Sequence, residues 1–168
     1  MSLFGKEKNK IINEKEILFY DAVVLAEYII TKCVKEDMPI SNLQLQKILY
    51  FIQYNFFKNF EAPAFLNRIE AWQHGPVVPD VYNKFAFMAG NPIIREYDIS
   101  EKIFEYDLDK ALVNKVTESC RKMRPWDLVE LTHKEGSPWR QVFKDGQKNE
   151  IPLQIIAEYA KDRKEHGK

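Results

Sequence analysis

The stretch from Leu43 to Phe60 constrains the fold more than any other part of the chain. It combines helix-forming residues with an unusually large number of aromatic side chains. Four of its apolar residues fall on one stripe at helical spacing: Leu45, Leu49, Ile52 and Phe56. The sequence therefore predicts a central core helix here. Aromatic residues also occupy its other faces, and such a helix is either buried on several sides or keeps one side for a partner.

Capping signals indicate where this helix and its neighbours begin. Ser41 and Gln44 match the capping box, in which each side chain pairs with the backbone N–H of the other residue. Asp21 and Ser137 are good N-caps for two further helices. Prolines suited to the first turn of a helix are Pro79, Pro125, Pro138 and Pro152. The helix that begins at Pro79 is expected to run through Lys84 and Phe87 and to end at Gly90.

Two segments carry weaker patterns. Residues 68–72 fit either a strand or a helical turn, and Ile93 to Tyr106 mixes β-branched and aromatic residues with weak alternation, which predicts a small strand or ribbon. A convincing helical stripe is formed by Leu108, Leu112, Val116, Cys120 and Met123. The sequence thus predicts a mainly α fold: a single compact domain of about six or seven helices with a minor β ribbon.

Length and charge limit the classes of protein that this chain can be. Its 168 residues, 45% of them hydrophobic, suit one domain at 16–160, with a polar N-terminal tail at 1–15 and a charged C-terminal tail at 161–168. The 25 basic and 25 acidic residues give a formal net charge of zero, which argues against nonspecific nucleic-acid binding. No apolar run approaches the roughly 18–20 residues of a membrane span, and the N-terminus lacks a signal-peptide core. We therefore expect a cytoplasmic protein, with Cys33 and Cys120 as reduced thiols.

Catalytic and metal-binding motifs are weak. The scattered glycines form no phosphate loop, and the two cysteines lack near partners for a structural zinc site, so no cofactor is expected. His74 and His133 could bind a metal or act as an acid/base pair if the fold brought a carboxylate to them. The candidates for that carboxylate are Asp80, Glu130 and Glu135. His74 can equally close a turn, and His133 with Glu135 can cap a helix end.

The three tryptophans, Trp72, Trp126 and Trp139, each lie beside a Gly, a Pro or a polar turn. An indole at such a place can cover a junction between helices and donate its N–H to a backbone carbonyl. The alternative is a partner-binding surface, because Trp and Tyr are common at protein interfaces.

Three segments read in order resemble one family. They are Leu45–Phe51, Ile69–Tyr82, and Leu131–Glu135 followed by Pro138–Trp139. This order resembles the Panacea domain, the SocA-like antitoxin family, whose members are also met as phage-associated proteins on prophages. The resemblance covers roughly residues 20–160. The residues that carry it are Gln46, Lys47, Tyr50, Glu70, Trp72, His74, Gly75, Pro76, Val77, Pro79, Tyr82, Thr132, His133, Pro138 and Trp139.

The resemblance implies a non-enzymatic protein that neutralises a toxin usually encoded beside it. Members do this by direct binding or by delivering the toxin to a Clp-type protease, and different members serve unrelated toxins. No catalytic residues carry over; the motif segments are expected to form a shared scaffold or a functional groove. The short charged ends argue against toxin recognition or DNA binding by extra tails. The alternatives are a metal-dependent or acid/base hydrolase that uses His74 and His133, and a prophage regulatory protein.

The aromatic surplus of the central helix suggests a binding face. We hypothesise that Tyr54, Phe56, Phe57 and Phe60 form part of a toxin-binding surface. The alternative is that these side chains pack under the loop at residues 62–66. The sequence leaves open the identity of the toxin, the choice between direct binding and proteolytic delivery, and the oligomeric state.

Overall fold

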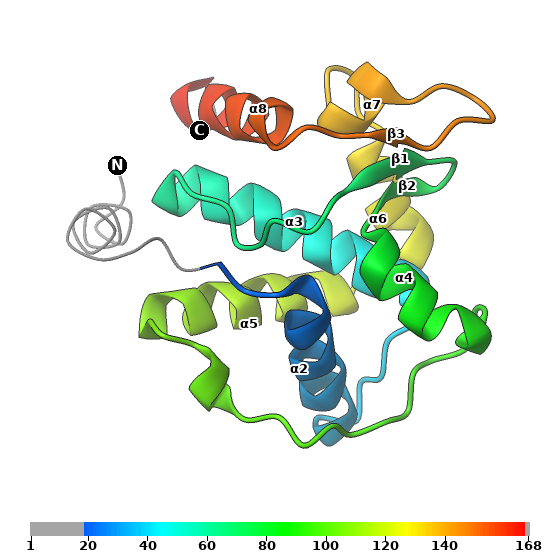
Figure 1. Ribbon diagram of the computed structural model, residues 1–168, viewed down its shortest axis with the longest axis vertical. Coiled ribbons are helices and arrows are strands. Elements are labelled where there is room, and N and C mark those ends of the chain that lie inside the picture. Colours follow the sequence, from blue (N-terminus) through cyan, green and yellow to red (C-terminus); the bar gives the residue numbers. More distant parts are fainter. Residues whose placement is uncertain (1–18, 167–168) are drawn as a thin grey trace.

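A computed structural model describes residues 19–166, so the expected polar tail at 1–15 lies outside the described residues. The described residues form seven α-helices and a small three-stranded sheet (Figure 1). The α-helices are α2 (Ala22–Lys35), α3 (Asn42–Phe60), α4 (Pro79–Phe85), α5 (Asp107–Arg121), α6 (Pro125–Thr132), α7 (Pro138–Val142) and α8 (Leu153–His166). The strands are β1 (Glu70–Trp72), β2 (Gly75–Val77) and β3 (Asn149–Glu150). The prediction of a mainly α domain with a minor β element is confirmed.

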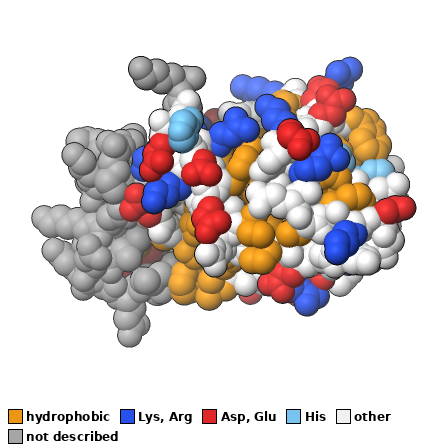
Figure 2. Space-filling model, turned by 90° about the horizontal axis from the view of Figure 1, so that it is seen from above, with side chains coloured by type: hydrophobic (Ala, Val, Ile, Leu, Met, Phe, Trp, Pro, Cys, Tyr) orange, Lys and Arg blue, Asp and Glu red, His pale blue; other side chains and the backbone are white. Residues whose placement is uncertain are grey.

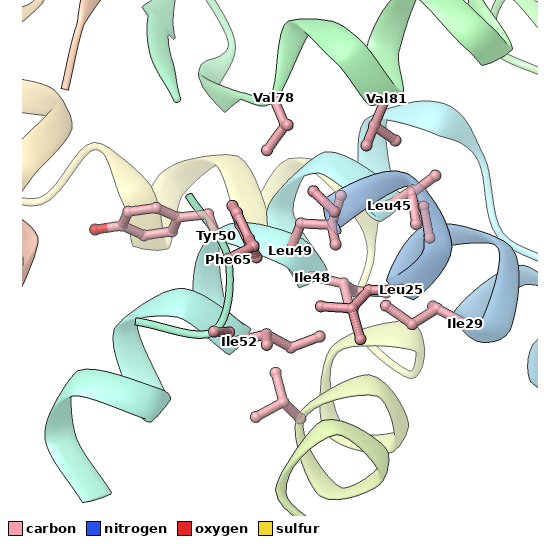
Figure 3. Packing of buried hydrophobic residues seen from close by; sticks show 14 of the residues in the cluster. Leu25, Ile29, Leu45, Ile48, Leu49, Tyr50, Ile52, Phe65, Val78 and Val81 are labelled. Atoms are coloured by element: carbon pink, nitrogen blue, oxygen red, sulfur yellow. The ribbon is translucent and has the colours of Figure 1, made fainter. Parts of the chain in front are cut away.

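Helix α3 lies at the centre of the molecule, between α8 on one side and α2 and α5 on the other (Figure 1). It contacts α2, α4, α5, α6, α8 and β2, so it is buried on several sides. All four residues of the predicted stripe are at most 1% exposed, and Leu45 and Leu49 lie among side chains from α2 and α4 (Figure 3). The prediction of a central core helix is therefore confirmed.

The predicted caps explain where several helices begin. The Ser41 hydroxyl accepts from the Gln44 backbone N–H at 3.3 Å, and the Ser41 N–H donates to Gln44 Oε1 at 3.0 Å. Asp21 Oδ1 accepts from the Val23 N–H at 2.7 Å, and the Ser137 hydroxyl accepts from the Arg140 N–H. Each of these side chains pairs a backbone donor that the first turn of a helix leaves free.

Strands β1 and β2 form a tight antiparallel hairpin in which Glu70 pairs with Val77 and Trp72 with Gly75. Strand β3 adds to the other side of β1, giving the order β2-β1-β3. The sequence left open a strand or a helical turn at residues 68–72, and the structure has a strand there.

The prediction of a strand or ribbon at Ile93 to Tyr106 is wrong. This segment is irregular, with one 3-10 turn, η2 (Glu101–Ile103). Its backbone donors pair with other parts of the fold: the Ile93 N–H donates to the Ile40 carbonyl, and the Tyr97 N–H to the Thr31 hydroxyl. Most of its apolar side chains pack on the core, whereas Ile94 is exposed, which explains the mixed pattern that resembled a strand.

Three helix ends also differ from expectation. Helix α4 ends at Phe85 and not at Gly90. A 3-10 turn, η1 (Ala86–Met88), follows it and contains Phe87. Met123 lies beyond the end of α5. Helix α8 extends to His166, so the described part of the charged segment 161–168 is helical. Within residues 19–166, no helix combines the length and the apolar character that a membrane span requires.

Candidate functional site

The first and second motif segments are joined by hydrogen bonds from α3 to the hairpin. Lys47 Nζ donates to the Pro76 carbonyl at 2.8 Å, and Gln46 Oε1 accepts from the Val78 N–H at 2.9 Å. Gln46 Nε2 in turn donates to Asn42 Oδ1 at 2.9 Å, which fixes the orientation of the amide. Both α3 side chains are at most 1% exposed, so these bonds are shielded from water.

The third motif segment contacts the first two at Gly75, through Thr132. A Cβ atom on Gly75 would lie 2.7 Å from both Lys47 Cε and Thr132 Oγ1, closer than side chains tolerate. The backbone of Gly75 also adopts φ +106°, a conformation that favours glycine. Glycine is therefore required where α3, the hairpin and the end of α6 come together.

Trp139 joins α7 to the hairpin. Its indole N–H donates to the Trp72 carbonyl at 2.6 Å, which confirms the expected use of an indole to cover a junction. The His133 ring stacks on Trp139 with centroids 3.6 Å apart, and Phe143 also stacks with it at 4.4 Å. Trp139 is buried, whereas the two rings that stack on it are partly exposed.

Glu70 orients Trp72, the tryptophan of the hairpin itself. Its buried carboxylate accepts from the Trp72 indole N–H at 2.6 Å and from Arg68 Nη2 at 2.5 Å. The Trp72 ring then meets Tyr82 of α4 edge to face, with centroids 4.7 Å apart. Glu70 therefore fixes the ring that α4 packs against.

Three further motif residues, Tyr50, Pro79 and Pro138, belong to helices. Tyr50 is buried in α3, and burial raises the pKa of its hydroxyl. Pro79 and Pro138 open α4 and α7, as their positions predicted.

A groove of about 700 Å³ opens beside these contacts; we call it the motif groove. Its apolar lining includes Trp72, Val77, Tyr82 and Phe143. Trp126 of α6 also lines it and is 58% exposed. The exposed His74 ring meets Trp126 edge to face at 5.1 Å. A large aromatic residue that stays exposed beside an apolar groove is typical of a protein-binding surface.

Burial lowers the pKa of two basic side chains near this groove, Lys47 and His133. Lys47 is fully buried, and burial lowers the pKa of its amine to about 7. Burial also lowers the pKa of His133 to about 4, and the nearby positive charges of Lys47, Arg140 and His74 lower it further. His133 is therefore neutral at pH 7. Its buried Nε2 has no hydrogen-bond partner among the residues that the structure describes.

The two histidines lie close enough to affect each other electrostatically. Within residues 19–166, no three side chains of His, Cys, Asp or Glu lie in an arrangement that could hold a metal ion. Asp80 accepts from Asn67 Nδ2 at 2.9 Å instead. Glu135 and Glu130 are exposed.

The hypothesised aromatic face of α3 needs a correction. Phe56 and Phe60 are 1% and 2% exposed and meet each other edge to face at 5.2 Å, so they belong to the core and not to a binding surface. Tyr54 and Phe57 are partly exposed and pack against the same core. The apolar character of these residues is evident from the sequence, but only the arrangement of α2, α5 and α8 around α3 decides which of them are covered.

The loop that forms one wall of the motif groove was missed by the sequence analysis. It follows α7 and contributes Phe143 and residues 145–148 to the lining. Lys148 Nζ lies 4.0 Å from the centre of the Trp72 ring, a cation–π contact between segments far apart in the chain. The dipeptide Asp145-Gly146 is a turn signal that the sequence analysis did not use, but a turn signal does not indicate which part of the fold the turn lies against.

Comparison with known proteins assigns the chain to a family. The family model described as "Antitoxin SocA-like, Panacea domain" matches residues 45–140, which include all three motif segments. Antitoxin SocA of Caulobacter vibrioides (strain NA1000 / CB15N) is 30% identical over 154 residues, covering 85% of this chain and 81% of that protein. No solved structure gives a significant match. The chain therefore belongs to the SocA-like antitoxin family, and Lys47, Gly75 and Thr132 all lie within the part that the Panacea-domain model matches.

Proposed function

We propose that this protein is an antitoxin that neutralises a protein toxin by binding it through the motif groove. The observation that carries the proposal is the exposed Trp126 beside an apolar groove built by the family's own motif residues. A buried scaffold around Gly75 supports the wall that the hairpin contributes, so binding does not require that wall to order first.

The charge of the chain supports a protein partner over a nucleic acid. The formal net charge is zero, and basic and acidic side chains are interspersed on the face shown in Figure 2. Nucleic-acid binding needs a basic face that releases counterions from phosphates. An aromatic groove without such a face is better suited to protein side chains.

Co-expression tests the proposal directly. The open reading frame beside the gene is expressed alone and together with this protein, and growth is scored. We expect the neighbour to arrest growth alone and to be harmless in the pair. Trp126→Ser should weaken rescue and copurification, because exposed Trp anchors commonly contribute about 2 kcal/mol or more to an interface. Leu66→Ser is the matched control, since Leu66 is 54% exposed and does not line the groove.

The same pair of proteins separates direct binding from proteolytic delivery. A toxin that is inhibited by purified antitoxin at equal concentration, with no protease present, is neutralised by binding. A toxin that is neutralised only when a Clp-type protease is added is delivered for degradation. If no neighbouring product is toxic, or if Trp126→Ser and Leu66→Ser rescue equally well, the proposal that the motif groove binds a toxin is wrong.

A further inference from the structure

We propose that a second surface, the groove between α3 and α5, binds an amphipathic helix of a partner protein whose apolar stripe is flanked by acidic side chains. Two adjoining hollows of about 360 and 290 Å³ make up this α3–α5 groove. They share Asn59, Leu112 and Lys115 in their linings. The proposal rests on the proposed function in one respect, that the natural partner is a protein.

The floor of the α3–α5 groove is apolar and incompletely covered. Its half-buried side chains are Phe51 on α3, Leu108 and Leu112 on α5, and Leu131 on α6. All four come from helices of the rigid core, so the groove does not need to rearrange to accept a partner. Apolar side chains left half-exposed between two packed helices offer the kind of seam that a third helix covers.

The dimensions of the groove favour a helix as the occupant. Its lining runs along α5 from Leu108 to Cys120, which at the helical rise corresponds to about 18 Å. A partner helix of about 12 residues spans that length and places three or four apolar side chains on one face. Small residues on the α5 side, Ala111 and Ser119, allow close approach.

Charge decides the chemistry of the occupant. Lys58 of α3 and Lys115 of α5 line the groove, and none of its described lining residues is an Asp or a Glu. Neither lysine forms an ion pair with a described residue. The motif groove differs in this respect, because its lining contains both Lys148 and Asp145. A partner with acidic residues beside its apolar stripe would complement the α3–α5 groove on both sides.

The polar side chains of α3 that face the groove are already engaged with their own helix. Asn55 Nδ2 donates to the Phe51 carbonyl at 2.7 Å, and Asn59 Nδ2 donates to the Asn55 carbonyl at 2.8 Å. One N–H of each amide is therefore engaged within α3. The charged groups that line the groove are the two ammonium groups, which stand beside the apolar floor.

A helix-biased peptide library displayed on phage tests the proposal without knowledge of the toxin. The library is selected on the full-length protein and on the double variant Lys58→Glu/Lys115→Glu. We expect the wild-type chain to enrich helices with an apolar stripe flanked by Asp or Glu. The selected peptides should bind the double variant at least about tenfold more weakly, since each reversal replaces an attraction by a repulsion. Selection on the double variant should instead enrich basic peptides.

The control is Lys35→Glu/Lys161→Glu, which changes the net charge equally at two exposed lysines outside this groove. Selected peptides should bind this control as they bind the wild type. Equal affinity for the wild type and Lys58→Glu/Lys115→Glu, or no enrichment of acidic residues, overturns the proposal. A dimer seen by light scattering that Lys58→Glu/Lys115→Glu dissociates would also overturn it, because the occupant would then be a second copy of this chain.

The two proposals fail in different ways. If co-expression finds no toxin but the selected peptides follow the charge of the groove, the proposed function is wrong and the groove remains a helix-binding surface. If the toxin is neutralised and the peptides ignore the charge reversal, the assignment of the α3–α5 groove is wrong and the antitoxin function remains.

Discussion

At the scale of single residues, Gly75 is where steric constraint is greatest. We expect Gly75→Ala to destabilise the protein by about 2–4 kcal/mol, because its Cβ would clash with Lys47 and Thr132 at an unfavourable φ. Gly136→Ala is the matched control: Gly136 has φ +75°, but a Cβ there would meet no atom within 4 Å, so only the backbone cost of about 1 kcal/mol remains. Urea unfolding measures both. Equal losses in the two variants would show that the close contact at Gly75 is relaxed in solution.

Lys47 imposes a pH dependence on folding. Burial lowers the pKa of its amine to about 7, whereas the unfolded chain has the ordinary value of 10.5. Between these values the unfolded state binds a proton that the folded state has lost, so the free energy of unfolding rises with pH across this window. We expect Lys47→Met to remove that rise and, at pH 6, to stabilise the protein on the order of 1–4 kcal/mol.

Urea unfolding of wild type and Lys47→Met at pH 6, 8 and 9.5 gives the comparison. The positive charge of Lys47 also lowers the pKa of His133, so the two proteins differ in that group near pH 6. Between pH 8 and 9.5 a histidine is neutral, so the difference between the two slopes in that range reports Lys47. The variant also leaves the Pro76 carbonyl without its donor, which costs about 1 kcal/mol at every pH and does not change the slope. Parallel curves for the two proteins would mean that the amine stays charged in the fold.

At the scale of elements, the aromatic residues of α3 separate into core and surface. Phe60→Ser should destabilise the protein by about 3–5 kcal/mol, because it empties a fully buried site that packs on Phe56. Phe57→Ser should cost less, since Phe57 is only partly buried. Thermal unfolding measures both, and toxin copurification shows whether Phe57 contributes to binding. If Phe57→Ser abolishes copurification with an unchanged melting temperature, Phe57 belongs to the toxin-binding surface.

The sequence indicates where helices begin, but it does not indicate which distant segments contact each other. The caps at Asp21, Ser41 and Ser137 depend on residues within one turn, so the sequence predicts them correctly. Residues 93–106 resemble a strand because several of their apolar side chains cover the core, but no strand within residues 19–166 pairs with them. Phe143 joins the candidate site only through the path of the chain after α7.

The contact between the three motif segments is a second feature that the sequence does not predict. Their residue types and order identify the family, but nothing local indicates that Lys47, Gly75 and Thr132 touch. The sequence likewise places Trp126 beside a turn without deciding between packing and exposure. Its 58% exposure follows from α6 packing its other face against α3 and β2.

At the scale of the whole molecule, one continuous core joins all the large helices. Buried residues from α2, α3, α4, α5, α6 and α8 belong to a single cluster, and α3 contacts each of these helices. A chain built around one central helix should lose its structure in one cooperative step, because removing any neighbour exposes α3. Cys33 lies on α2 and Cys120 on α5, so the reactivity of the two thiols measures the opening of two different neighbours of α3.

We therefore expect both thiols to be unreactive in the folded protein and to become reactive together. Both are buried, and burial raises the pKa of Cys33 and raises that of Cys120 to about 11, so little thiolate forms at pH 8. Labelling with a thiol-specific disulfide reagent at increasing urea should follow one exponential, with a rate that tracks the population of the unfolded state. Protein in concentrated guanidinium chloride, where both thiols react at once, is the control. Two phases, one of them independent of global stability, would mean that α2 or α5 opens separately and that the domain is not a single cooperative unit.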